Sequence, residues 1–241
     1  MKGSQGRRPL VISHAACAGH APENTLAGVR RALELGADAV EVDVRATADG
    51  VPVLLHDETL ERTTSGRGPL RSLPFAALGG LDAGQGERVP ALAAAVALLA
   101  GRALLVAEIK EAGIEARVEA ALAPLGSQGG QVWSFLPDVL AAYGRLAPHR
   151  PRVLLVGAEG LGQWPRPLAL ARELGAAGLS VRHEALTPPR VAQVREAGLL
   201  LYAWIADDPH DLGRLLALGL DGIVTNYPDR LRALLRRGPA P

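Results

Sequence analysis

The stretch LELGADAVEVDV, residues 33–44, passes from a helical pattern through one glycine into a run with a two-residue period. Gly36 stands where a left-handed residue commonly follows a helix end. After it, valines alternate with Glu41 and Asp43, so the valines occupy one face of a strand and the carboxylates occupy the other. The stretch therefore predicts a helix, a glycine cap and a strand in immediate succession.

The same pattern recurs along the chain, in RELGAAGLSV (172–181), REAGLLLYAWI (195–205) and LALGLDGIVTN (216–226). Strands that alternate with helices are typical of parallel βα units. We therefore predict a (β/α)8 TIM barrel, with a doubly wound open sheet as the alternative. The absence of a Gly-x-Gly-x-x-Gly motif after the first strand weakens a dinucleotide-binding interpretation. The eight expected strands span residues 9–13, 39–45, 103–109, 131–134, 152–156, 178–181, 199–205 and 222–225.

Helix starts are marked by caps and prolines. The first helix is expected over residues 25–35, with Asn24 as its N-cap. Pro137, Pro209 and Pro228 each suit the first turn of a later helix. The segment 22–25, Pro-Glu-Asn-Thr, is open to two interpretations, a helix entry or a direct substrate contact.

Two segments interrupt the alternation after the second strand. RATADGVPVLLHDE (45–58) contains an Asp49-Gly50 turn between extended runs, which predicts a hairpin. Residues 61–88 are rich in glycine and contain no long helical pattern. We expect a small hairpin and loop elaboration of one domain, residues 1–241.

Composition excludes several classes of partner. Of the 241 residues, 48% are hydrophobic and the net charge is +1, so neither nucleic acid nor an anionic membrane surface is expected as a partner. The longest apolar stretch, 89–100, is too short to span a bilayer, and no targeting segment is visible. The single cysteine, Cys17, fits a reducing compartment. We expect a cytoplasmic protein without stable membrane insertion, and the sequence makes no prediction of oligomeric state.

Polar side chains gather where the predicted strands end. In a barrel of this type the carboxyl ends of the strands face the active site. The strand period places Arg45 on the same face as Glu41 and Asp43, and it places Lys110 with Glu108. The candidate site residues are His14, Glu41, Asp43, Arg45, His56, Glu108, Lys110 and Trp204.

These residue types together indicate phosphodiester chemistry. Three carboxylates held close repel one another unless a cation lies between them. Oxygen ligands favour Mg2+ or Ca2+ over zinc. The two histidines then remain free for proton transfer, and the metal and the lysine supply positive charge to a phosphate in the transition state.

The motifs resemble the glycerophosphodiester phosphodiesterase family. The resemblance begins with APENTLAGVRRALELGADAVEVDVRATADGVPVLLHDETLERTTSGRG (21–68) and continues in order through EIK (108–110), WSFLPDVL (133–140), YAWIADDP (202–209) and DGIVTNYPDRL (221–231). It covers nearly the whole chain. It implies a TIM barrel that cleaves small glycerophosphodiesters to glycerol 3-phosphate and an alcohol, in a route where the substrate's glycerol hydroxyl attacks phosphorus and water opens the resulting cyclic phosphate.

The resemblance also implies a role for each site residue. His14 and His56 would act as the general acid and base, and Lys110 would be a catalytic residue that binds the phosphate. Trp204 would form an apolar wall beside the glycerol. The implied metal ligands are Glu41, Asp43 and Glu108.

The chain departs from the family pattern beside the first histidine. The family's His-Arg-Gly is here His14-Ala15-Ala16, so an arginine that contacts the phosphate is missing. Loss of such a contact costs about 1.5–3 kcal/mol, or roughly one to two decades in rate. Ala16 replaces a glycine, which predicts a different backbone path. Asn226 stands where many relatives have aspartate.

Three arginines are candidates to compensate, and Arg45 is favoured because the strand period points it at the site. The others are Arg62 and Arg182. Two alternative functions stay open: a non-catalytic barrel that binds phosphorylated ligands, and a phosphodiesterase for a lysophospholipid or sphingolipid. The retained histidines, carboxylates and lysine favour the enzyme, and the lack of a long apolar stretch ranks the lipid substrate lower.

Overall fold

The computed structural model describes residues 8–237, in which eight parallel strands form a closed barrel. Strand β1 pairs in parallel with both β2 and β9, and this double pairing closes the barrel. The predicted TIM barrel is confirmed, and the open doubly wound sheet is wrong. The barrel strands are β1 (Leu10–Ser13), β2 (Ala39–Ala46), β4 (Leu104–Ile109), β5 (Gly130–Ser134), β6 (Arg152–Val156), β7 (Gly178–Arg182), β8 (Leu200–Trp204) and β9 (Gly222–Thr225).

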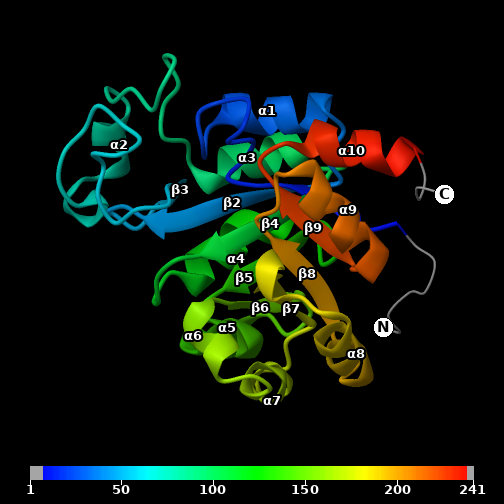
Figure 1. Ribbon diagram of the computed structural model, residues 1–241. Coiled ribbons are helices and arrows are strands. Elements are labelled where there is room, and N and C mark those ends of the chain that lie inside the picture. The colour runs from blue at the N-terminus through cyan, green and yellow to red at the C-terminus, as the bar shows by residue number, and fades with distance from the viewer. Residues whose placement is uncertain (1–7, 238–241) are drawn as a thin grey trace.

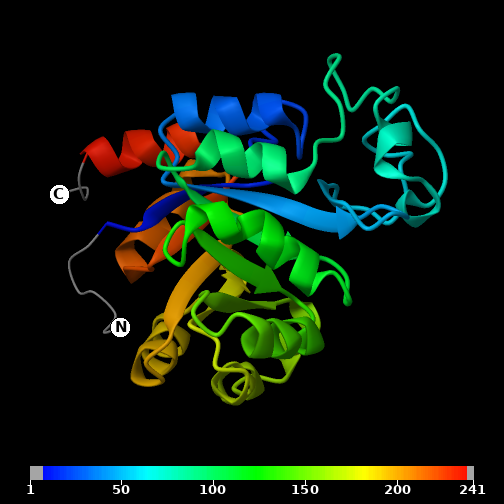
Figure 2. The same cartoon turned by 180° about the vertical axis from the view of Figure 1, so that it is seen from behind.

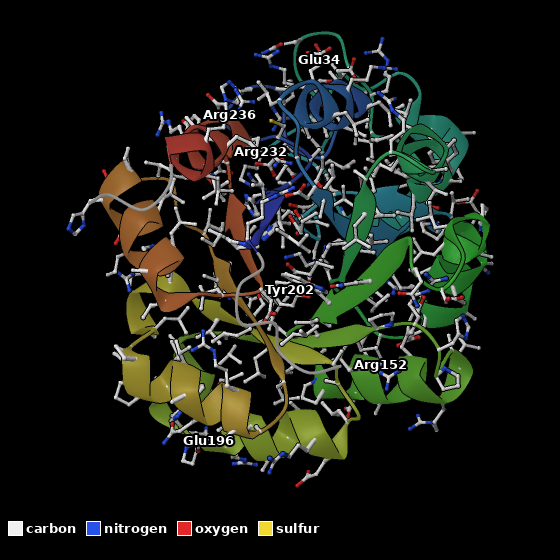
Figure 3. The ribbon with its side chains drawn as sticks, turned by 90° about the vertical axis from the view of Figure 1, so that its right-hand side faces the viewer. Glu34, Arg152, Glu196, Tyr202, Arg232 and Arg236 are labelled. Atoms are coloured by element: carbon white, nitrogen blue, oxygen red, sulfur yellow. The ribbon has the colours of Figure 1, made fainter. Side chains whose placement is uncertain are left out.

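Helices surround the barrel. Figure 3 shows them as a ring around the strands, with Tyr202 near the centre and Glu34, Glu196 and Arg236 at the periphery. The expected prolines begin helices α5, α9 and α10. The helices are α1 (Leu26–Glu34), α2 (Phe75–Leu78), α3 (Leu92–Leu99), α4 (Glu115–Leu122), α5 (Pro137–Leu146), α6 (Ala158–Gly162), α7 (Arg166–Glu173), α8 (Pro188–Glu196), α9 (Pro209–Leu218) and α10 (Pro228–Arg237), with short 3-10 turns at Leu70–Ser72, Ala123–Leu125 and His183–Ala185.

One additional strand, β3 (Pro52–Leu54), pairs antiparallel with the end of β2. The turn between them includes Gly50 at φ +75°, a conformation that favours glycine. The chain then makes an excursion that contains α2 and its own small apolar cluster. Figures 1 and 2 show this excursion beyond the tip of β2, at the opposite side of the molecule from the two termini. The expected hairpin and loop elaboration is confirmed.

The alternation in β2 decides which side chains face the barrel interior. Val40, Val42 and Val44 are fully buried in the apolar layer between the barrel and its helices. Glu41 and Asp43 therefore point inward, toward the second apolar cluster, which fills the barrel with side chains such as Trp133 and Tyr202. Within residues 8–237, no helix combines the length and the hydrophobicity needed to cross a bilayer.

The N-cap of α1 is one residue later than expected. Thr25 Oγ1 accepts a hydrogen bond from Gly28 N at 3.2 Å, so Thr25 caps the helix. Asn24 has φ +57°, whereas an N-cap residue adopts extended backbone. The prediction of Asn24 as the cap is wrong, because its side chain is directed toward β2 instead.

Candidate active site

A cavity of about 300 Å³ opens at the carboxyl ends of the barrel strands. Its polar side comes from β1, β2, β4 and the segment after β3, and its apolar side comes mainly from β5, β6 and β8. Because these strands end at one rim, residues distant in sequence meet in one cavity. The lining residues are His14, Ala15, Glu23, Glu41, Asp43, His56, Asp57, Arg62, Glu108, Lys110, Trp133, Phe135, Leu155, Trp204, Ile205 and Val224.

Three buried carboxylates form the acidic part of the cavity. Asp43 of β2 lies in register with Glu108 of β4, and Glu41 lies two residues earlier on the same face. One oxygen from each residue lies within 4.8 Å of the others. The structure thus brings together Glu41, Asp43 and Glu108, the three candidate metal ligands.

Glu41 has one satisfied and one unsatisfied carboxylate oxygen. Its Oε2 accepts a hydrogen bond from Ala15 N at 2.7 Å, whereas its buried Oε1 has no hydrogen-bond partner among the described residues. Burial, together with the charges of Asp43 and Glu108, raises the pKa of Glu41 well above its ordinary value. A group in this state favours either a proton or a cation.

Asp43 is held from two directions. Asn24 Nδ2 donates to Asp43 Oδ2 at 2.7 Å, and Asp43 N donates back to Asn24 Oδ1 at 3.0 Å. Lys110 Nζ lies 2.9 Å from Asp43 Oδ1. Burial alone raises the pKa of Asp43, but the Lys110 charge and the Asn24 hydrogen bond bring that pKa below its ordinary value. Asp43 is therefore the carboxylate that is most firmly ionised.

Lys110 links the second carboxylate to the third. Its Nζ lies 2.5 Å from Glu108 Oε1. Although burial opposes it, the charges of Asp43 and Glu108 raise the pKa of Lys110, so the ammonium stays protonated. Burial has the larger effect on Glu108 and raises its pKa despite Lys110. The cluster thus combines one firmly ionised carboxylate and an ammonium with two carboxylates whose pKa is raised.

The donor set fits a hard divalent cation. All three residues offer oxygen, which is the ligand that Mg2+ and Ca2+ prefer. The unpartnered Glu41 Oε1 is the atom whose burial such an ion would compensate. The three carboxylates therefore form a possible metal site, and their oxygen ligands do not distinguish Mg2+ from Ca2+.

His14 is oriented by a chain of hydrogen bonds. Asn226 Nδ2 donates to Asp207 Oδ2 at 2.7 Å, which leaves Asn226 Oδ1 to accept from His14 Nδ1 at 2.8 Å. This network assigns the proton of neutral His14 to Nδ1 and leaves its Nε2 as an acceptor. The backbone N of Asn226 also donates to Asp207, to Oδ1 at 2.8 Å, so Asp207 holds both the backbone and the side chain of Asn226.

His56 has a charged partner instead of an amide. Its Nδ1 lies 2.7 Å from Asp57 Oδ1, and Arg62 Nε donates to Asp57 Oδ2 at 2.5 Å. The Arg62 hydrogen bond, with a further contribution from His56, lowers the pKa of Asp57 to about 2. Arg62 also donates to both Glu23 oxygens, at 2.9 and 2.7 Å. Asp57 thus presents a permanent negative charge to the His56 imidazole.

Arg45 lies in a neighbouring cavity of about 300 Å³ that it shares with Glu58, Arg71 and Glu111. Its Nε donates to the His56 carbonyl oxygen at 2.8 Å, and its Nη1 lies 3.4 Å from Glu111. The strand period did not bring Arg45 to the acidic cluster, because β2 continues past the barrel there and pairs with β3 through Arg45 and Val53.

Arg182, another of the arginines considered, is 45% exposed and pairs with Glu184. Of the arginines in residues 8–237, Arg62 is the one that lines the candidate active-site cavity.

Aromatic residues form the opposite wall. Trp204 Nε1 donates to Ser180 O at 3.1 Å, which fixes the indole. Phe135 packs edge-on against Trp204, with ring centroids 5.5 Å apart. Trp133 lies deeper, at 1% exposed. Trp204 therefore lies where the sequence placed it, at the cavity wall.

Sequence reasoning did not assign three of the supporting residues. Asn24 was expected at a helix cap, and Asp207 carried no assigned role. Asn226 was noted only as a departure from relatives. Asn24 binds Asp43 and Asn226 binds His14 through side-chain hydrogen bonds, and Asp207 in turn holds Asn226. The only available signal for these residues was their presence within recognised motifs.

Comparison with known proteins gives consistent matches. Residues 14–230 match the sequence model described as the glycerophosphoryl diester phosphodiesterase family. The chain is 33% identical over 245 residues to the glycerophosphodiester phosphodiesterase of Caldanaerobacter subterraneus subsp. tengcongensis, and the match covers 96% of this chain and 99% of that protein.

Solved structures share the fold along almost the whole chain. A glycerophosphodiester phosphodiesterase from Agrobacterium tumefaciens is 30% identical with a TM-score of 0.83, covering 94% of this chain and 100% of that one. An Oleispira antarctica phosphodiesterase, solved in complex with the product sn-glycerol-3-phosphate, is 29% identical with a TM-score of 0.85, covering 95% of this chain and 97% of that one.

Proposed function

The chain belongs to the glycerophosphoryl diester phosphodiesterase family and is an enzyme of that family, and on this premise we propose that it hydrolyses glycerophosphodiesters to glycerol 3-phosphate and an alcohol with the help of Mg2+ or Ca2+. One observation carries the proposal: three buried carboxylates, a lysine and two histidines converge on one cavity. The histidines stand at its polar side, where a diester bound to the lysine and the cation would lie between them.

Phosphate binding is assigned to Lys110 and the cation site. Glu41, Asp43 and Glu108 would hold the ion, which when bound would supply positive charge to the phosphate oxygens. Lys110 carries a stable positive charge beside them. Arg62 lines the cavity, but its hydrogen bonds go to Glu23 and Asp57, so its proposed role is to hold Asp57. Arg45, the arginine favoured from the sequence, binds the His56 carbonyl and is assigned to positioning that residue.

The hydrogen-bond partners divide the two histidines between base and acid. His14 Nδ1 donates to the neutral Asn226 amide oxygen, so its Nε2 is left as an acceptor for a proton. The partner of His56 Nδ1 is instead the Asp57 carboxylate, a charged group that can only accept. We therefore assign His14 as the base and His56 as the acid of the first step.

In that step His14 removes the proton of the glycerol 2-hydroxyl, and this oxygen forms a bond to phosphorus. The bond between phosphorus and the alcohol oxygen breaks, and His56 donates a proton to the leaving oxygen. In the second step His56 takes a proton from water as the water oxygen bonds to phosphorus. The bond to the glycerol 2-oxygen breaks, and that oxygen receives the proton held by His14. Trp204 would pack beside the glycerol carbons throughout.

The test is release of glycerol 3-phosphate from glycerophosphocholine, measured with Mg2+, with Ca2+ and with EDTA. We expect release with at least one of the ions and loss of release in EDTA. Glu41→Gln should lower release because it removes the charge from a buried ligand at nearly constant shape. Glu196→Gln, at an exposed position on α8, is the matched control.

Two results would contradict the proposal. Release that is equally fast in EDTA would show that the reaction does not need a divalent cation. Binding of glycerol 3-phosphate without any release from diesters would instead support a non-catalytic barrel.

A further inference from the structure

Glu111, in the segment between β4 and α4, lines the same cavity as Arg45. Its side chain is only 14% exposed. Glu111 Oε1 accepts a hydrogen bond from Ala46 N at 2.8 Å and lies 3.1 Å from Arg71 Nη2. Glu111 Oε2 accepts from Arg71 Nε at 3.2 Å and from Arg45 Nη1 at 3.4 Å. One carboxylate thus connects the end of β4 with the end of β2 and with the excursion that follows β3.

The Arg45 guanidinium lies between Glu111 and His56. Its Nη1 donates to Glu111, and its Nε donates to the His56 carbonyl oxygen at 2.8 Å. A second carboxylate near Arg45, that of Glu58, lies 3.9 Å from Nη1 and is 83% exposed, so water screens this pair. Glu111 therefore sets the direction in which the Arg45 guanidinium points.

The carbonyl that Arg45 binds belongs to the peptide between His56 and Asp57. Before this peptide, Leu55 N donates to the Asp43 carbonyl at 3.0 Å, which anchors the chain on β2. After it, Asp57 Oδ1 lies 2.7 Å from His56 Nδ1. Because a peptide group is planar, a hydrogen bond that fixes its carbonyl also fixes the backbone from which both side chains of the His56–Asp57 pair project.

We propose that Glu111 is a positioning residue for His56: by holding Arg45, it fixes the peptide between His56 and Asp57 and therefore the imidazole that protonates the leaving alcohol. This inference rests on the proposed function, because it requires His56 to be the acid of the first step. Glu111 does not line the candidate active-site cavity, so its effect on the reaction passes through His56.

Two substrates with different leaving groups isolate this role. The alkoxide of choline is a strong base that must receive a proton as its bond to phosphorus breaks, whereas p-nitrophenolate is a weak base that leaves without one. We would measure kcat/KM for glycerophosphocholine and for glycerophospho-p-nitrophenol, with the cation that supports release. This constant covers the steps up to departure of the alcohol, so the later opening of the cyclic phosphate does not enter it.

Glu111→Gln should lower kcat/KM about 10- to 100-fold for glycerophosphocholine but less than about threefold for the nitrophenyl diester. Glutamine can keep an oxygen toward Ala46 N, and it then presents an NH2 donor to the Arg45 donor. The matched control is Glu58→Gln, which removes an exposed carboxylate near the same guanidinium and should change neither constant. Equal losses on both substrates, or no loss on either, in a folded Glu111→Gln protein would overturn the proposal.

A double variant tests whether Glu111 acts through His56. In a His56→Ala protein, Glu111→Gln should cause no further loss of kcat/KM for glycerophosphocholine, because the side chain that it positions is gone. A further loss of about tenfold in the double variant would overturn the proposal. If Glu111→Gln does not fold, Arg45→Lys takes its place, because a lysine lacks the planar fork that binds two acceptors at once. It should show the same dependence on the leaving group, and equal losses on both substrates would overturn the proposal.

The wild-type rates separate this inference from the proposed function. A wild-type protein that releases neither alcohol would overturn the proposed function and, with it, the role of Glu111. Wild-type turnover of both substrates, with a loss in Glu111→Gln that does not depend on the leaving group, would overturn the role of Glu111 alone.

Discussion

At the residue scale, the turn after β1 has an unusual backbone. Ala15 has φ +43° and Ala16 has φ +67°, in the left-handed region that costs an alanine about 1–2 kcal/mol. Two hydrogen bonds to Glu41 hold the turn, from Ala15 N to Oε2 and from Ala16 N to the backbone oxygen, each at 2.7 Å. The turn is therefore locked to a candidate metal ligand, with Ala15 at the cavity wall.

Ala15→Arg should raise kcat/KM for glycerophosphocholine. The substitution places a guanidinium where the family's His-Arg-Gly pattern has an arginine, next to the proposed phosphate site. A charge-assisted contact of about 1.5–3 kcal/mol made in the transition state corresponds to roughly 10- to 100-fold in rate. Steady-state kinetics with Mg2+ measure the change.

Ala15→Met is the control for that variant, because methionine has a long side chain without charge. We expect it to show no gain. Equal kcat/KM for the arginine and methionine variants would mean that a guanidinium at this position adds nothing to catalysis.

Asn226→Ala should lower kcat/KM for glycerophosphocholine about three- to tenfold, because it removes the acceptor that fixes the Nδ1 proton and the ring of His14. Steady-state kinetics measure the loss, and circular dichroism checks that the variant is folded. An unchanged kcat/KM in a folded Asn226→Ala protein would contradict the role of Asn226 in positioning His14.

The residues that the sequence located well are those whose placement follows from the strand period. Glu41, Asp43 and Glu108 meet because alternate side chains of neighbouring parallel strands share a face. Asn24 and Asp207 could not be assigned in the same way, because their roles depend on which distant group their side chains reach. Arg45 does not line the candidate active-site cavity, for a geometric reason. It keeps the strand period, but at Arg45 the strand β2 extends beyond the barrel and pairs with β3.

At the element scale, helices α4 and α5 are joined by a buried ionic cluster. Arg150, only 1% exposed, donates from Nε and Nη2 to the two oxygens of Glu119 at 2.6 and 2.9 Å. Tyr143 of α5 also donates to Glu119 of α4. Burial raises the pKa of Glu119 by itself, yet Arg150 and Tyr143 hold that pKa below its ordinary value. The carboxylate is therefore ionised, and it accepts both from α5 and from Arg150 in the segment that precedes β6.

Glu119→Gln should lower the free energy of unfolding by about 3–5 kcal/mol, because it leaves the buried Arg150 guanidinium without its counter-charge. Urea unfolding at pH 7 followed by circular dichroism measures the loss. Glu196→Gln, on the exposed end of α8, should change the value by less than about 0.5 kcal/mol. A loss as small as that of the control would mean that Arg150 finds another partner or water in the variant.

The strands were predicted closely because each is a short apolar run, and four of them follow a helix that ends in a glycine. The second was expected over 39–45 and spans Ala39–Ala46, and the third was expected over 103–109 and spans Leu104–Ile109. The antiparallel partner β3 was foreseen from its Asp-Gly turn. The excursion after it carried no periodic signal, since its order comes from a local apolar cluster, loop hydrogen bonds and contacts such as Phe75 N to Asp49 Oδ1 at 3.0 Å.

At the scale of the whole molecule, the first and last elements of the barrel meet at Asp38, just before β2. Its Oδ2 accepts from Arg8 at 2.6 Å and from Val11 N at 2.9 Å, and its Oδ1 accepts from Arg232 of α10 at 2.6 Å. Asp38 thus ties the start of β1 and the final helix to the strand beside which β1 closes the barrel. The contact between Asp38 and Arg232 joins residues 194 positions apart, and no local pattern predicts such a pair.

Asp38→Asn should lower the free energy of unfolding at pH 7 by about 1–3 kcal/mol, because an amide cannot replace the charge shared by two guanidinium groups.

Burial alone raises the pKa of Asp38, but Arg8, Val11 N and Arg232 hold that pKa below its ordinary value in the folded state. A lowered carboxyl pKa contributes stability that is fully present above the pKa of the unfolded chain and is lost as the pH falls through the folded pKa. The difference between wild type and Asp38→Asn should therefore be full at pH 7 and shrink below about pH 4. Urea titrations at pH 7, 5 and 3 measure it, with Asp138→Asn at an exposed position of α5 as the control. A difference that is the same at all three values would mean that the lost stability comes from packing and not from the charge of Asp38.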